Sequence, residues 1–232
     1  MVTVEICAQS YQAAINAYEG GAHRIELCRK LPGGGLTPSI TVIRQVCQEI
    51  NIPVYVLIRP REGDFVFNAQ EINAMQLDIA KCLDSGASGI VCGVLDASDS
   101  INVAGLSLLV AACQGMPFTF HRAFEQIKDQ DIAIQQMMSL GGVHRILTGG
   151  KTGNAYQCRK ELKELNFRLG DQIILLAGSG VTSANASSIV NETGVTEIHA
   201  SAKYTTTDDW NKAINPYDSD PQEVRRIVAA VK

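Results

Sequence analysis

A short motif that recurs four times along the chain is the feature that most limits its fold. Each copy has a glycine, a small or β-branched residue, two variable positions and then an isoleucine. The copies read GGAHRIEL, SGASGIVC, GGVHRILT and ETGVTEIH, and their anchoring glycines are Gly21, Gly86, Gly142 and Gly194. Each follows a segment of helical periodicity, so we expect the glycine to end a helix and the isoleucine to lie in a strand.

Four more short apolar runs lie between the copies, at residues 3–7, 53–59, 117–121 and 172–177. All eight runs are apolar on both faces, which is typical of parallel strands covered on both sides. The sequence therefore predicts an α/β protein, a single (β/α)8 TIM-barrel domain over residues 1–232. A doubly wound open sheet is less favoured, because no GxGxxG motif opens the first strand–helix turn.

The composition limits which partners and which cellular compartment we expect for the protein. The net charge of −4 and the absence of a basic run argue against nucleic acid or an anionic membrane as the main partner. No stretch approaches 18 apolar residues, and the first residues show no signal-peptide pattern. The seven cysteines form no CxxC pair, so we expect reduced thiols and a cytoplasmic protein. Barrels of this size commonly dimerise, so a homo-oligomer is expected.

Polar residues gather where the expected strands end, which is where a TIM barrel places its chemistry. Two related segments, VEIC and RIELC, end the first two strands and carry Glu5, Cys7, Glu26 and Cys28. A glutamate and a cysteine two positions apart on a strand point to the same side. Of the four histidines, His121 and His199 fall near strand ends, whereas His23 and His144 fall at strand starts and are expected to be structural.

Proton transfer on a small ligand is one chemistry that these residues support. Carboxylate and imidazole groups suit general acid–base catalysis, and arginine and hydroxyl groups suit an anionic or polyol ligand. The expected catalytic residues are Glu5, Glu26, His121 and His199, and the expected ligand-binding residues are Arg59, Arg61, Arg122 and Ser201. Alternatively, Arg59 and Arg61 only neutralise the two buried glutamates.

The glycine-rich segment AGSGV follows the seventh expected strand, and its Gly178 and Gly180 are candidates for binding a phosphate through backbone N–H groups. The alternative is that these glycines only permit a tight turn.

Two metal chemistries remain open from the residues alone. Histidine with carboxylate, as in Glu5, Glu26, His121 and His199, suits Zn²⁺, Mn²⁺ or Fe²⁺, whereas the thiolates of Cys7 and Cys28 suit Cu(I). The spacing of these residues does not choose between them.

A set of longer motifs runs in order from residue 4 to about residue 202: EIC, GGAHRIELC, GGLTPS, IPVYVLIRPREGDF, TFHRAFE, RILTGG and EIHASA. In these motifs the chain resembles the copper homeostasis protein CutC family. The resemblance implies a cytoplasmic TIM barrel that takes part in copper tolerance or trafficking and binds Cu(I), with Cys7 and Cys28 as the copper thiols. The many Glu, Arg and His side chains keep an alternative open, a lyase, isomerase or hydrolase of a small phosphorylated or carboxylated metabolite.

Overall fold

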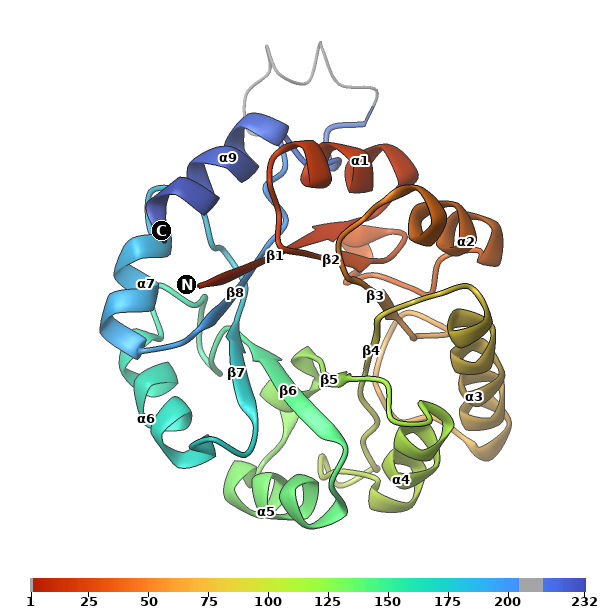
Figure 1. The fold of residues 1–232 in the computed structure, drawn as a ribbon. Helices are drawn as coiled ribbons and strands as arrows, with labels where there is room; N and C mark the ends of the chain where they lie inside the picture. The colour runs from red at the N-terminus through yellow and green to blue at the C-terminus, as the bar shows by residue number, and fades with distance from the viewer. Residues whose placement is uncertain (1, 205–214) are drawn as a thin grey trace.

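The structure, a computed structural model, describes residues 2–204 and 215–232. Eight parallel strands close into a barrel in the order β1 to β8, and helices surround it (Figure 1), so the predicted TIM barrel is confirmed. The strands are β1 Thr3–Ala8, β2 Arg24–Leu27, β3 Val54–Leu57, β4 Gly89–Cys92, β5 Phe118–Phe120, β6 Val143–Thr148, β7 Ile174–Ala177 and β8 Glu197–Ala200.

Helices connect the strands and pack against their outer face. They are α1 Tyr11–Glu19, α2 Ile40–Glu49, α3 Ala69–Asp84, α4 Val103–Ala112, α5 Gln130–Leu140, α6 Arg159–Leu169, α7 Ala186–Thr193 and α9 Pro221–Ala230, with short 3₁₀ turns η1 Leu31–Gly33 and η2 Arg122–Gln126. No helix in residues 2–204 or 215–232 is long and apolar enough to cross a membrane.

Local sequence signals set where these helices begin. Ser10 accepts a hydrogen bond from the backbone of Ala13 and caps α1. Asn68 and Glu71 form a capping box at the start of α3, so each satisfies a backbone N–H group of the other. Since helices follow the strands directly, the strand ends all emerge on one side of the barrel.

The main apolar core lies between the barrel and the helices, and a smaller cluster lies inside the barrel. The inner cluster contains Cys7, Cys28, Tyr55, Leu57 and Val91. These residues alternate along their strands with residues of the outer core, such as Ile6 and Val56. The alternation explains how VEIC and RIELC place their glutamates and cysteines inside the barrel.

His23 and His144 have the structural role expected of them. His23 Nδ1 accepts a hydrogen bond of 2.9 Å from the backbone N–H of Val4. His144 Nδ1 accepts one of 3.2 Å from the backbone N–H of Phe118. Both therefore tie a strand start to the neighbouring strand.

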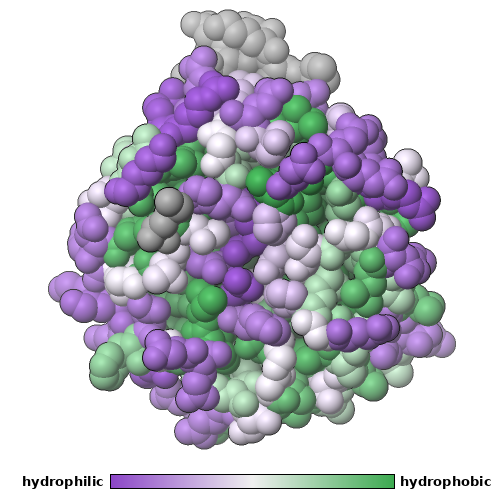
Figure 2. Space-filling view, viewed as in Figure 1, coloured by the Kyte–Doolittle hydropathy of each residue, from purple (hydrophilic) through white to green (hydrophobic). Residues whose placement is uncertain are grey.

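A layer of paired charges fills the barrel interior at the end where the strands begin. Arg24 donates to both Glu5 and Glu197, and its guanidinium lies 4.8 Å from the centre of the Tyr55 ring. Arg145 donates to Glu197 at 2.8 Å and to the Tyr55 hydroxyl at 3.1 Å. In Figure 2, hydrophilic residues accordingly gather at the centre of the barrel face that is turned to the viewer.

Breaking this layer should destabilise the fold. Replacing Arg24 with Met removes the cation that Glu5 and Glu197 share while both carboxylates stay buried. We expect the free energy of unfolding, measured by urea denaturation, to fall by about 3–5 kcal/mol. Arg168→Met is the control, because that arginine pairs with Asp131 at the surface and its loss should cost about 1 kcal/mol or less. Equal losses in the two variants would contradict a structural role for the layer.

Candidate functional site

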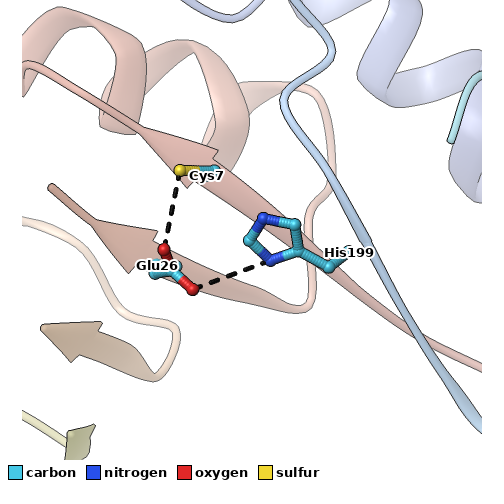
Figure 3. Close-up of side chains that lie close together, drawn as sticks. All are labelled: Cys7, Glu26 and His199. Atoms are coloured by element: carbon cyan, nitrogen blue, oxygen red, sulfur yellow. Dashed lines mark hydrogen bonds and ion pairs between the residues drawn. The ribbon is translucent and has the colours of Figure 1, made fainter. Parts of the chain in front are cut away.

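Four of the predicted residues meet at the floor of the barrel mouth. The strand register pairs Cys7 with Glu26 and Glu5 with His199, so the ends of β1, β2 and β8 converge. Cys7 Sγ lies 3.6 Å from Cys28 Sγ and 3.7 Å from Glu26 Oε1. The sulfur of Cys7, a carboxylate oxygen of Glu26 and a ring nitrogen of His199 all lie within 4.8 Å of one another (Figure 3).

A cavity of about 510 Å³ opens above this floor. Cys7, Cys28, Glu26 and His199 border it below. Its walls include Leu57, Phe65, Leu147, His121, Arg122 and Lys203. Glu5 does not border the cavity, because it lies one layer deeper and is fully buried.

Glu5 holds His199 from below. Its Oε1 lies 2.7 Å from His199 Nδ1, and its other oxygen accepts from Arg24. Burial alone would raise the pKa of Glu5, but Arg24 and His199 outweigh it and lower the pKa to about 2. Burial would lower the pKa of His199, yet Glu26, Cys7 and Glu5 raise it well above 6.5. A charged imidazolium thus faces a carboxylate at the floor of the cavity.

Glu26 and Cys7 hold their protons more tightly than usual. Burial raises the pKa of Glu26 to about 7, and the negative charge of Glu5 adds to this effect while His199 opposes it. The hydrogen bond with Cys28, together with burial, raises the pKa of the Cys7 thiol. Glu26 Oε2 is buried and lacks a hydrogen-bond partner among the described residues. The floor therefore combines the protonated thiol of Cys7 with the carboxyl group of Glu26 near its titration point.

His121 lies at the cavity wall, apart from the other three proposed catalytic residues. Its Nδ1 accepts a 3.2 Å hydrogen bond from the backbone of Ala123, at the start of η2. Burial, with the nearby charge of Arg59, lowers the pKa of His121 to about 3, so the ring stays neutral. With Nδ1 accepting, Nε2 carries the proton, and it has no partner in the described structure.

Arg59 and Arg61 do not neutralise the buried glutamates, so that interpretation is wrong. β3 ends at Leu57, and the strand alternation stops before either arginine. Arg59 donates instead to the carbonyls of Gly33, Gly35 and Gly63 and lies over Phe65. Arg61 pairs with Glu71 and Asp64. Neither arginine borders the cavity.

Arg122 and Ser201 do border the cavity, but Arg122 is already paired. Its Nε and Nη2 each donate to one carboxylate oxygen of Glu125 at 2.8 Å. Ser201 lies just past the end of β8 and is half-buried at the wall.

In each of the loops after β6 and β7, a carboxylate of the chain itself already accepts from a backbone N–H group. After β6, Glu125 accepts from the backbone of Gly149 at 2.9 Å. After β7, Glu223 of α9 accepts from the backbone and hydroxyl of Ser183. Gly178 donates to Thr148 O, and a Cβ there would meet Leu147 at 2.5 Å. Close packing against Leu147 therefore explains the glycine at position 178.

Gly180 differs from Gly178, because it borders the cavity. Its φ of +69° also requires the left-handed conformation that glycine adopts without strain. A role in ligand contact remains a prediction for this residue.

Several residues of the site were not found from the sequence. Arg24 and Glu197 lie at strand starts, where only stability was expected, yet Arg24 pairs with both Glu5 and Glu197 and keeps Glu5 ionised. The sequence did carry a signal for them. Arg24 lies two positions before Glu26, and Glu197 lies two positions before His199, so each pair shares one side of its strand. Lys203 and Tyr217 border the cavity from segments that carry no strand or helix pattern.

The buried neutral His121 should make the fold acid-sensitive. Its pKa is lower in the folded protein than in the unfolded chain, so its stabilising contribution is complete above about pH 6.5. This contribution is lost as the pH falls toward about 3. His121→Asn keeps a side-chain acceptor for Ala123 but does not titrate. Between pH 7 and pH 5 the wild type should lose about 2 kcal/mol more unfolding free energy than this variant. Parallel pH profiles from urea denaturation would contradict the assignment.

Comparison with known proteins places this geometry in a family. The model of the CutC family matches residues 2–204. A human protein named copper homeostasis protein cutC homolog is 40% identical over 202 residues, which cover 87% of this chain and 74% of the human one. A CutC family protein of Pasteurella multocida is 38% identical over 200 residues, covering 86% and 82% of the two chains.

Solved structures agree. The CutC protein of Streptococcus agalactiae superposes with a TM-score of 0.81 at 35% identity, covering 87% of this chain and 99% of that one. A phosphoribosylanthranilate isomerase of Pyrococcus furiosus reaches 0.62 at 12% identity over 99% and 98% of the chains, and so shares the fold alone. On its family match and these relatives, the chain belongs to the CutC family.

Proposed function

We propose that this protein is a cytoplasmic copper homeostasis protein that binds Cu(I) through Cys7 and Cys28 for tolerance or trafficking. The observation that carries the proposal is the 3.6 Å separation of the two sulfurs at the floor of an open cavity. Thiolates are soft ligands that select Cu(I). The names of the human and bacterial relatives support the same role.

The spacing of the sulfurs favours a third donor. With metal–sulfur bonds of about 2.3 Å, two sulfurs on opposite sides of an ion would lie about 4.6 Å apart. The sulfurs of Cys7 and Cys28 are closer than that, at 3.6 Å, so they suit a bent arrangement with room for another ligand. His199 presents its second ring nitrogen toward Cys7 (Figure 3), and it is the donor best placed to complete the site.

Glu5 supports this role for His199. Histidines that bind metals usually hold a carboxylate with their other ring nitrogen, which fixes the ring and strengthens the ligand. The 2.7 Å contact between His199 Nδ1 and Glu5 Oε1 has this form. Glu26 Oε1 lies 3.7 Å from Cys7 Sγ. It is placed to serve as a fourth donor to the metal, through oxygen, or to accept the proton of the thiol.

Replacing both thiols tests the copper site. In the Cys7→Ser/Cys28→Ser double variant we expect loss of the Cu(I) that the wild type retains against bicinchoninate, because serine hydroxyls are poor Cu(I) ligands. The measurement is a competition titration under reducing conditions. Cys47→Ser, on the half-buried face of α2, is the matched control and should bind as the wild type does. Unchanged Cu(I) stoichiometry in the double variant would refute the proposal.

Glu5 should act through His199 without touching copper. In Glu5→Gln the amide no longer carries the charge that orients and strengthens His199. We expect the Cu(I) affinity in the same titration to fall by about 10–100-fold. The stoichiometry should stay at the wild-type value, because both thiols remain. A circular dichroism spectrum identical to that of the wild type controls for folding. An unaltered affinity would exclude His199 as a ligand.

An acid–base enzyme is the second candidate, and Glu26 is the observation that favours it. Its pKa near 7 suits proton transfer at the floor of a cavity of substrate size. Its Oε2 has no hydrogen-bond partner among the described residues and lies 3.8 Å from His199 Nδ1. The substrate of such a lyase, isomerase or hydrolase would be a small phosphorylated or carboxylated metabolite. Such an enzyme would need Glu26 and would tolerate loss of both cysteines, which separates the two proposals.

A further inference from the structure

We propose that the cavity above Cys7 and Cys28 binds a small thiol that bears a carboxylate and delivers Cu(I) as its thiolate complex. The inference rests on the proposed copper function and names the form in which the ion arrives. It assigns His121 and Lys203 to recognition of the carrier.

The size of the cavity is the first argument. A single ion held by two sulfurs and a histidine occupies only the floor, whereas the cavity measures about 510 Å³. Sites for small organic molecules have volumes of roughly 300–1,000 Å³ and combine apolar walls with a few polar groups. Leu57, Phe65 and Leu147 supply such walls directly above the thiols. The volume therefore indicates an organic occupant in addition to the metal.

An unpartnered buried donor is the second argument. His121 is 6% exposed, and its Nε2 has no hydrogen-bond partner within residues 2–204 and 215–232. A buried donor without an acceptor destabilises the folded protein. His121 borders the cavity beside Phe65, whose ring centre lies 4.7 Å from its own, and the Nδ1–Cε1 edge of His121 packs on Gly93. An acceptor oxygen of an occupant that reaches Nε2 would satisfy this donor.

The charge of the wall is the third argument. Lys203 borders the cavity, and it has no acidic partner in the described part of the chain; its Nζ lies 5.8 Å from the Tyr217 ring centre. Lys203 and His121 are both donors, so they select an occupant with acceptor oxygens. A carboxylate offers two such oxygens and therefore suits this wall.

The transfer itself is a ligand exchange without a redox change. Two bonds from Cu(I) to carrier sulfurs break, and bonds to Cys7 and Cys28 form in their place. The two cysteine protons pass to the departing carrier thiolates, which leave as thiols. Copper stays in the +1 state and the total charge is conserved. The cavity holds the carrier while its sulfur and the floor thiols are close enough to exchange.

Binding of reduced glutathione to the metal-free protein tests the inference. Glutathione carries one thiol and two carboxylates, and calorimetry measures its affinity without any copper. We expect saturable binding that weakens about tenfold or more in His121→Asn and in Lys203→Met. Lys151→Met is the matched control, because that lysine lies on the loop after β6 outside the cavity lining. Its affinity should equal that of the wild type.

A second arm separates this inference from the copper proposal. The Cys7→Ser/Cys28→Ser variant should still bind glutathione but take no copper from its Cu(I) complex. His121→Asn and Lys203→Met should take copper from that complex more slowly, yet reach wild-type Cu(I) affinity against bicinchoninate. If glutathione fails to bind the wild type, or binds all variants equally, the carrier site is refuted while the copper site stands. If the wild type binds glutathione but retains no Cu(I), the copper site is refuted while the glutathione site stands.

Discussion

The hydrogen-bonded chain from Arg24 through Glu5 to His199 is the constraint on which the site depends. Arg24 keeps Glu5 ionised inside the barrel, and the ionised Glu5 fixes the ring of His199 at 2.7 Å. Without the arginine, burial would favour the neutral carboxylic acid. Charges that belong to the stability layer of the barrel therefore determine the orientation of a side chain in its functional mouth.

Much of this arrangement could be predicted from the sequence. The glycine-anchored repeat predicted the eight strands and the barrel, because periodicity and helix ends are local properties. The convergence of Cys7, Cys28, Glu26 and His199 followed from strand parity and neighbouring strand order. The partners of the arginines did not follow. Arg59 and Arg61 lie past the end of β3, where alternation no longer sets direction, and their contacts depend on loop carbonyls and helix residues.

The glycine-rich loops illustrate a second limit of sequence patterns. They have the composition of anion-binding turns, yet Glu125 and Glu223 already accept from their donors. Glu223 lies on α9, far along the chain from the loop that it occupies. Long-range contacts of this kind leave no local signature. At Gly149 and Ser183 the chain therefore supplies its own anion to the turn.

Metal binding must change the protonation of the residues at the floor of the cavity. Cys28 and burial raise the pKa of the Cys7 thiol, so Cys7 holds its proton, and a thiol reacts more slowly with oxidants than a thiolate does. A metal ion binds the deprotonated sulfur, so its arrival must expel that proton. Glu26, with its pKa near 7 and 3.7 Å from Cys7, is placed to pass the proton on to the departing carrier thiolate. Metal capture and proton release are then a single event, and the cavity above determines which molecule can start it.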